Sequence, residues 1–340
     1  MTMQERKKLP TLALVLPCYN EEQVLPISLP AVSAKIAELV AAKIIGPDSF
    51  ALFVDDGSRD QSWDILVAAA RNSQELKGGL RRIRAISLAV NVGHQNALLA
   101  GLTHVASRCD MAISLDADLQ HNIAVFEEMI AKYMNGAEIV LGIRASTEKQ
   151  SWFKRQSSRL YYRLLRSIGV KIIANHADFR LMSSRALRHL RQFDESNVFL
   201  RAMPSLLHKR IAVVSYNQLA RPAGRSKYNL SKMLSLAWNG ITSFSIFPLR
   251  LITAIGFMIF LVSIGFSVNA AIDWFNHRTL PGWVSVTLPL YLLGGILMLS
   301  IGIVGEYLGK IFVEVKRRPR YIIDLTTEDK ERDMEKDHHD

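Results

Sequence analysis

The sequence predicts an α/β protein in which a mostly parallel sheet, flanked by helices, is followed by a hairpin of two membrane-spanning helices. Three observations support this fold class. Short apolar runs of strand type alternate with helical patterns, which is typical of βαβ units. Polar turns follow several of these runs, and open parallel sheets bind their ligands at such strand ends. Two long uncharged runs lie in the last third of the chain.

The first apolar run, 12–16, ends at Pro17 and predicts a buried parallel strand. Comparable runs predict further strands at 50–54, 83–88, 111–115, 138–142 and 211–216. Helical patterns lie between them, over about 22–42, 61–71, 97–107 and 125–134. The chain has neither a Gly-x-Gly-x-x-Gly fingerprint nor a P-loop, which disfavours a dehydrogenase or an NTPase.

The formal charge of +11 is unevenly distributed along the chain. Residues 324–340 carry eight acidic and three basic side chains, and this polar tail is expected to be disordered at its end. No acidic residue occurs from 196 to 272. A basic face can bind nucleic acid, an anionic membrane or phosphorylated substrates. The two cysteines, Cys18 and Cys109, provide no disulfide or zinc framework, which indicates a reducing compartment.

The uncharged runs 251–272 and 283–305 are each long enough to span a bilayer as a helix. The alternative is a pair of buried core helices. Basic residues at 250 and from 310 to 320 predict a cytoplasmic position for both termini, with the short connection between the runs on the other side. Membrane and lipid-linked partners then outrank nucleic acid.

Two further segments favour a membrane surface. Residues 150–169 combine apolar and aromatic side chains at helical spacing with five basic ones, so this helix either lies at an anionic membrane interface or packs on the domain. Residues 229–246 form a helical pattern ahead of the first run. The predicted domains are therefore a catalytic domain over 1–228, a juxtamembrane helix over 229–246, the two spans within 247–313, and a tail over 314–340.

Candidate functional residues follow the strands. Asp116 and Asp118 stand after the fourth strand, where two carboxylates can share a divalent cation with a diphosphate; the alternative is an ordinary polar loop. Asp55 and Asp56 can cap the next helix or bind a base or ribose. Asp178 and Arg180 form an ion pair or face a reacting phosphate. The cations of the 221–228 loop either hold a diphosphate or are solvated.

These stretches together resemble the motifs of family 2 glycosyltransferases, and more narrowly the polyprenyl-phosphate type. That group includes dolichol-phosphate mannose synthase and the bacterial undecaprenyl-phosphate glucosyltransferases. The matching stretches are Leu-Pro-Cys-Tyr-Asn-Glu at 16–21, Val-Asp-Asp-Gly-Ser at 54–58, 91–95, Asp-Ala-Asp-Leu-Gln at 116–120, Ala-Asp-Phe-Arg at 177–180, and 221–228. Each motif is weak alone, but six in order with two apolar runs are specific.

The resemblance implies a GT-A, Rossmann-like catalytic domain that transfers one sugar with inversion from a nucleotide sugar to a polyprenyl phosphate. Glucose, UDP and undecaprenyl phosphate are the expected sugar, nucleotide and acceptor, and the product would supply cell-envelope glycan modification. It also implies a two-span protein of the bacterial inner membrane with the catalytic domain in the cytoplasm, and a homo-oligomer such as a tetramer.

The resemblance assigns roles residue by residue. Metal ligands for Mg²⁺ or Mn²⁺ would be Asp116, Asp118 and Gln120. Catalytic residues would be Asp178, Arg180 and Asp118, with Asp178 either a base or a group that positions the acceptor. The nucleotide sugar would contact Pro17, Tyr19, Asn20, Glu21, Asp55, Asp56, Asp116, Arg221, Ser226 and Lys227. The alternatives are a membrane-anchored nucleotidyltransferase and a non-catalytic nucleotide-binding membrane scaffold. A channel or flippase would need polar residues within the spans, and the spans contain no ionisable ones.

Overall fold

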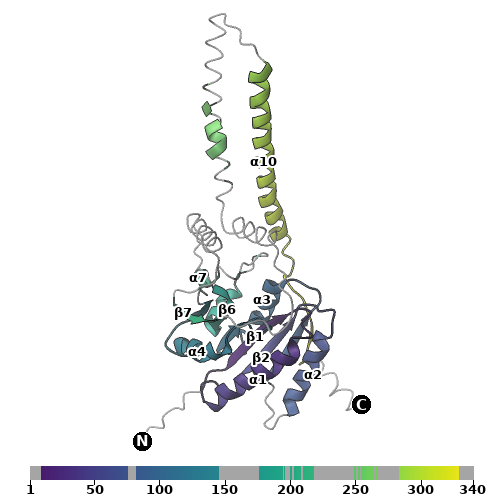
Figure 1. The fold of residues 1–340 in the computed structure, drawn as a ribbon, viewed down its shortest axis with the longest axis vertical. Helices are drawn as coiled ribbons and strands as arrows, with labels where there is room; N and C mark the ends of the chain where they lie inside the picture. The colour runs from purple at the N-terminus through teal and green to yellow at the C-terminus, as the bar shows by residue number, and fades with distance from the viewer. Residues whose placement is uncertain are drawn as a thin grey trace, which may run out of the picture. The chain divides into compact units, whose positions relative to one another are not determined.

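The computed structural model describes residues 9–75, 82–144, 176–193, 195, 200, 203–207, 210–217 and 283–328, with scattered residues between 249 and 265. These residues fall into two compact units. The larger unit contains the sheet, including a strand from the C-terminal tail, and the smaller contains the long helix α10 (Trp283–Val315) (Figure 1).

An eight-stranded mixed sheet, in the order β7-β5-β6-β4-β1-β2-β3-β8, is the core of the larger unit. The pairs β1–β2, β1–β4, β2–β3 and β5–β7 are parallel. The strands are β1 (Leu12–Cys18), β2 (Phe50–Asp55), β3 (Ile83–Leu88), β4 (Met111–Ser114), β5 (Ile139–Arg144), β6 (His176–Ser183), β7 (Ile211–Tyr216) and β8 (Ile323–Thr326). The predicted α/β class is confirmed, but the sheet is mixed, with four parallel and three antiparallel strand pairs.

The central strands are mainly apolar, as expected for strands that helices cover on both faces. In β1, Leu12, Leu14 and Leu16 face one apolar cluster while Ala13 and Val15 face the other. The first face is covered by α1 (Leu25–Ala41), α2 (Ser62–Glu75) and α4 (Phe126–Met134), and the second by α3 (His94–Val105), α6 (Ser184–Leu190) and α7 (Met203–Leu207). This two-sided burial leaves the strand ends as the exposed polar edge of the sheet.

Strand β6 runs antiparallel between β4 and β5, a direction that the sequence pattern did not indicate. Ser183 pairs with Met111 at the start of β4, and Arg180 pairs with Ser114 at its end. The beginning of β6 therefore lies beside the end of β4. This reversal brings Asp178 to the same edge of the sheet as Asp116.

The tail adds an antiparallel edge strand, β8, to β3. The Thr327 hydroxyl accepts a hydrogen bond from the backbone N–H of Ala85, and Arg84 pairs with Glu328 at 3.2 Å. Residues 324–328, at the start of the acidic tail, are therefore held against β3. A four-residue strand with only two large apolar side chains, Ile323 and Leu325, has too little pattern for recognition from sequence.

Among the residues that the structure describes, no helix has both the length and the apolar character needed to cross a membrane. On this finding the predicted transmembrane hairpin at 251–272 and 283–305, and with it the placement as a two-span inner-membrane protein, is wrong. The second run ends at Gly305, but α10 continues to Val315 and carries Glu306, Lys310 and Glu314.

Several predictions concern segments outside the described residues. These are the basic helix at 150–169, the juxtamembrane helix at 229–246, much of the first apolar run, the connection at 273–282, and the loop that contains Arg221, Ser226 and Lys227. They stay predictions.

Candidate active site

The site begins where the β1–α1 and β2–α2 turns bind each other. The backbone N–H of Asn20 donates to the Ser58 hydroxyl at 2.9 Å, and the side-chain oxygen of Asn20 accepts from the backbone N–H of Arg59 at 2.9 Å. The backbone N–H of Glu21 donates to Ser62. Asn20 has a φ of 53°, which asparagine tolerates better than most residues. The two loops therefore form one rigid rim beside Pro17, and Tyr19 on it is 36% exposed.

Asp55 ends β2 and is almost fully buried. Its carboxylate accepts from the Ser87 hydroxyl at 3.0 Å and from the backbone N–H of Ser58 at 3.3 Å. Beside it, the Cys18 thiol lies 3.5 Å from the Val54 carbonyl, and burial raises the pKa of that thiol well above its ordinary value. Cys18 is thus a protonated packing residue rather than a nucleophile.

Asp56 has its carboxylate engaged within the fold. It accepts from the backbone N–H groups of Val92 and Gly93 at 2.8 and 3.0 Å. Burial raises the pKa of Asp56, and the two backbone hydrogen bonds oppose that rise. The carboxylate satisfies N–H groups at the start of α3, where negative charge is stabilised by the helix dipole. Asp56 therefore positions α3, and its predicted contact with nucleotide stays a prediction.

The Asp-Ala-Asp-Leu-Gln stretch turns sharply after β4. Asp118 is buried, and its Oδ1 accepts from the backbone N–H of Gln120 at 3.2 Å. Between them, Leu119 adopts a φ of 51°, a conformation that costs energy for a residue with a Cβ. Asp116 is more open, with 37% of its side chain exposed. One carboxylate is thus held by the turn and the other faces solvent.

His94, the first residue of α3, lies between two carboxylates that are far apart in sequence. Its Nε2 is 3.5 Å from Oδ1 of Asp116 and 3.7 Å from Oδ2 of Asp178. The imidazole is 44% exposed, so the three side chains gather at an accessible point of the strand-end edge. His94 lies within the 91–95 stretch that resembles a family motif, but no role was predicted for it; its position at the start of a helix was the signal available.

Arg180 holds the Asp178 carboxylate in place through a buried ion pair. Its Nη2 donates to Oδ1 of Asp178 at 2.8 Å, and its Nη1 donates to the Leu200 carbonyl at 2.6 Å. Arg180 is 2% exposed and Asp178 is 7% exposed, so this ion pair is buried. Removing one member of a buried pair is strongly destabilising because it leaves the other charge uncompensated. Arg180 therefore orients Asp178 and does not face solvent.

His121, which follows Gln120, is a second histidine at the site without a predicted role. Its ring stacks on Phe179, with centroids 4.9 Å apart and an angle of 26° between the planes, and lies near Tyr216. The backbone N–H of Asp116 donates to its Nδ1 at 3.4 Å, and its Nε2 lies 3.9 Å from Oδ2 of Asp116. Burial lowers the pKa of His121, which favours the neutral ring.

The strand-end site offers some of the oxygen ligands that a hard divalent cation needs. Asp116 and Asp118 offer carboxylate oxygens and Gln120 an amide oxygen, the ligands that Mg²⁺ and Mn²⁺ prefer. Within the described part of the chain, however, no three His, Cys, Asp or Glu side chains gather closely enough to hold a metal by themselves. A cation here would need oxygen ligands from a bound diphosphate, which is the usual arrangement for Mg²⁺.

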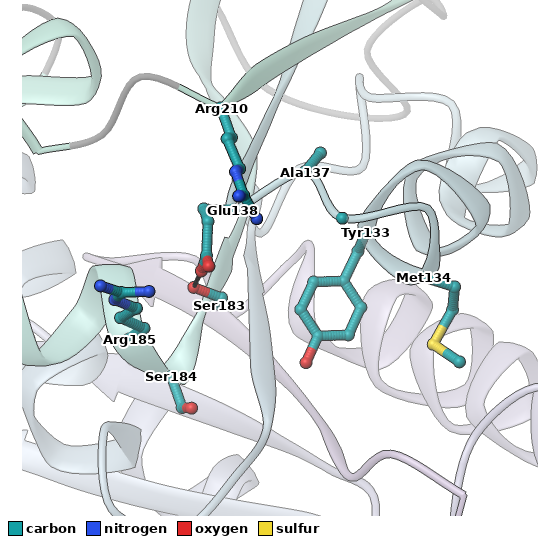
Figure 2. A pocket seen from close by; sticks show the side chains of 9 residues that line it. Tyr133, Met134, Ala137, Glu138, Ser183, Ser184, Arg185 and Arg210 are labelled. Atoms are coloured by element: carbon teal, nitrogen blue, oxygen red, sulfur yellow. Dashed lines mark hydrogen bonds between the residues drawn. The ribbon is translucent and has the colours of Figure 1, made fainter.

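A cavity of about 350 Å³ lies elsewhere on the unit. Figure 2 shows its lining, which includes Tyr133, Glu138, Ser183 and Arg210. Ser183 pairs with the start of β4, whereas Asp116 follows its end. This cavity therefore lies at the opposite ends of the strands from Asp116 and is separate from the carboxylate site.

The mixed sheet and the carboxylates at its strand ends define the class as an α/β protein with an acidic site at one edge of the sheet. Residues 13–191, more than half of the chain, match the family described as glycosyl transferase family 2. The chain belongs to this family, and it is a glycosyltransferase.

Relatives match over nearly the whole chain. The uncharacterized glycosyltransferase YkoT of Bacillus subtilis (strain 168) is 43% identical, over 93% of this chain and 92% of its own length. The SfII prophage-derived bactoprenol glucosyl transferase of Shigella flexneri is 35% identical, over 92% of this chain and 97% of its own length. The prophage bactoprenol glucosyl transferase homolog of Escherichia coli (strain K12) is 34% identical, over 92% and 98%.

Proposed function

We propose that the protein transfers one hexose, glucose from UDP-glucose, to a polyprenyl phosphate, with inversion at the anomeric carbon and with a divalent cation. The observation that carries this proposal is the meeting of Asp116 and Asp178 at His94, with Nε2 at 3.5 and 3.7 Å. One carboxylate belongs to the Asp-x-Asp turn after β4 and the other to β6. Donor and acceptor groups can therefore meet at one point. The relatives named bactoprenol glucosyl transferase support the choice of sugar and acceptor.

The donor side is formed by the rim of the β1 and β2 turns together with the Asp116 turn. Asp55, Tyr19 and Asn20 would contact the nucleotide, and Asp116, Asp118 and Gln120 would hold Mg²⁺ or Mn²⁺ against the diphosphate. The cation would stabilise the negative charge that grows on the departing nucleotide diphosphate. Arg221, Ser226 and Lys227 are further candidates for phosphate contacts.

The acceptor side is formed by Asp178 and His94. An oxygen of the acceptor phosphate attacks the anomeric carbon while the bond from that carbon to the β-phosphate oxygen breaks, so UDP leaves and the configuration inverts. A phosphate monoester is largely ionised at neutral pH and needs little help from a base. If it arrives as the monoanion, its proton can pass to Oδ2 of Asp178, since Arg180 occupies Oδ1.

The test is a transfer assay with the purified full-length protein, undecaprenyl phosphate in detergent micelles, Mn²⁺ and a panel of labelled nucleotide sugars. We expect lipid-linked glucose from UDP-glucose, with UDP released in equal amount. Release of pyrophosphate would indicate nucleotidyl transfer instead. If no donor yields a lipid-linked sugar under conditions in which Mn²⁺ and UDP bind, the proposal fails.

A further inference from the structure

The His121 imidazole is the polar group that the proposed reaction leaves unexplained. It is 2% exposed, and a buried polar ring is costly unless its nitrogens are hydrogen-bonded. Its stacking on Phe179 fixes the plane of the ring but satisfies neither nitrogen. Its apolar surroundings therefore do not account for a histidine at this position.

The hydrogen-bond pattern determines which nitrogen of His121 carries the proton. The backbone N–H of Asp116 points at Nδ1, so Nδ1 accepts and, in the neutral ring, Nε2 carries the hydrogen. Within the described part of the chain, Nε2 has no hydrogen-bond partner. It does face Oδ2 of Asp116 at 3.9 Å, slightly beyond hydrogen-bond distance.

We propose that His121 is a positioning residue for Asp116, whose carboxylate turns to accept a hydrogen bond from Nε2 when the donor and its cation bind. This inference rests on the proposed function. The hydrogen bond would hold Oδ2 and leave Oδ1, on the side of His94, directed at the cation. Hydrogen bonds to metal-ligating carboxylates fix their orientation, and losing such a partner typically lowers metal affinity about 10- to 100-fold.

Two variants separate this role from simple packing. His121→Gln places an amide N–H near the position of Nε2 but removes the acceptor near Nδ1. His121→Asn does the reverse, keeping an acceptor near Nδ1 and removing the distal donor. A purely structural histidine that only accepts from the Asp116 backbone would be replaced better by Asn. A positioning histidine would be replaced better by Gln.

The measurement is Mn²⁺ binding to the full-length protein with UDP, by electron paramagnetic resonance titration, with thermal unfolding recorded for each variant. We expect His121→Asn to weaken Mn²⁺ binding at least about tenfold, and His121→Gln to stay within about threefold of the unmodified protein. In the Asp116→Asn background, His121→Asn should cause no further loss.

Equal Mn²⁺ affinity in the two variants, or a tenfold loss in His121→Gln, would overturn the positioning role. If His121→Asn does not fold, the Gln variant alone decides by the same threshold. An overturned positioning role leaves the proposed function intact as long as the unmodified protein binds Mn²⁺ with UDP and forms lipid-linked sugar. Absence of Mn²⁺ binding in the unmodified protein would overturn the metal-dependent reaction and the role of His121 together.

Discussion

Asp118 and Asp178 are both buried acidic side chains, yet their neighbours differ. Asp118 is held by the turn after β4, at the backbone N–H of Gln120, whereas Asp178 is held by Arg180 and faces His94. Under the proposed function, Asp118 belongs to the donor and its cation, and Asp178 to the acceptor. Removing the charge of each carboxylate should therefore affect donor affinity and turnover differently.

We expect Asp118→Asn to weaken Mn²⁺-dependent UDP-glucose binding and to slow transfer, with partial recovery at high Mn²⁺, because a charged ligand is lost. Asp178→Asn should lower the thermal stability, because the buried charge of Arg180 loses its partner. In the variant that remains folded at the assay temperature, turnover should fall about 10²-fold or more while donor affinity stays within about twofold, because the substrate partner of Asp178 binds separately. Calorimetry of donor binding and turnover with labelled donor check both. An equal loss of donor affinity in the two variants would contradict this division.

At the scale of elements, α3 decides where His94 lies. The helix packs against β1 and β2 at Gly101, where an added Cβ would lie 2.5 Å from a methyl carbon of Val15 and 2.7 Å from one of Val54. The absence of a side chain at 101 therefore allows α3 to lie close to the sheet. The start of the same helix is held by Asp56 through Val92 and Gly93.

Gly101→Ala should lower the free energy of unfolding by about 1–3 kcal/mol, because the new methyl forces α3 away from the strands. Turnover should also fall, since His94 moves with the helix. The matched control is Gly302→Ala in α10, where an added Cβ meets nothing within 4 Å. That change should stabilise its helix by about 0.5–1 kcal/mol. Urea unfolding measures both changes. An unchanged free energy of unfolding in Gly101→Ala would show that α3 has room for the added methyl group.

At the scale of the whole molecule, the tail completes the sheet that carries the site. β8 covers the outer edge of β3, whose Ser87 donates to Asp55 at the rim formed by the β1–α1 and β2–α2 turns. Arg320 donates to the Phe193 carbonyl at 2.6 Å, and Ala89 donates its backbone N–H to Ile322 at 3.0 Å. The last part of the chain thus stabilises a strand that lies more than two hundred residues before it.

Ending the chain after Arg320 should remove the β8 pairing and lower the free energy of unfolding by roughly 2 kcal/mol or more, at about 1 kcal/mol for each hydrogen bond lost. Donor affinity should also fall, because Ser87 then lies on an exposed edge strand. A control chain that ends at Glu328 keeps every tail contact named above. Thermal unfolding and calorimetry with UDP distinguish the two, and identical behaviour would show that β8 is dispensable.

Much of the sheet could be predicted because its signal is local. The apolar runs identified β1 to β5 and β7 to within two residues at most ends, since strands buried on both faces are continuously apolar. The pairing of β6 could not be predicted, because its direction depends on β4 and β5, which are distant in sequence. The prediction of a hairpin failed in a different way. An apolar run shows where charged residues are missing, but it does not show where a helix ends, and α10 continues past Gly305 to Val315.

For the candidate site, the sequence by itself determined which carboxylates follow strands: Asp55, Asp116 and Asp118 stand at turns that any parallel arrangement places on one edge. Only the tertiary structure decided that Asp178 joins them, that Asp56 is turned inward, and that His94 and His121 lie beside Asp116. The physical reason is that backbone periodicity is encoded in neighbouring residues, whereas distances between side chains depend on strand order, register and helix packing across the whole sheet.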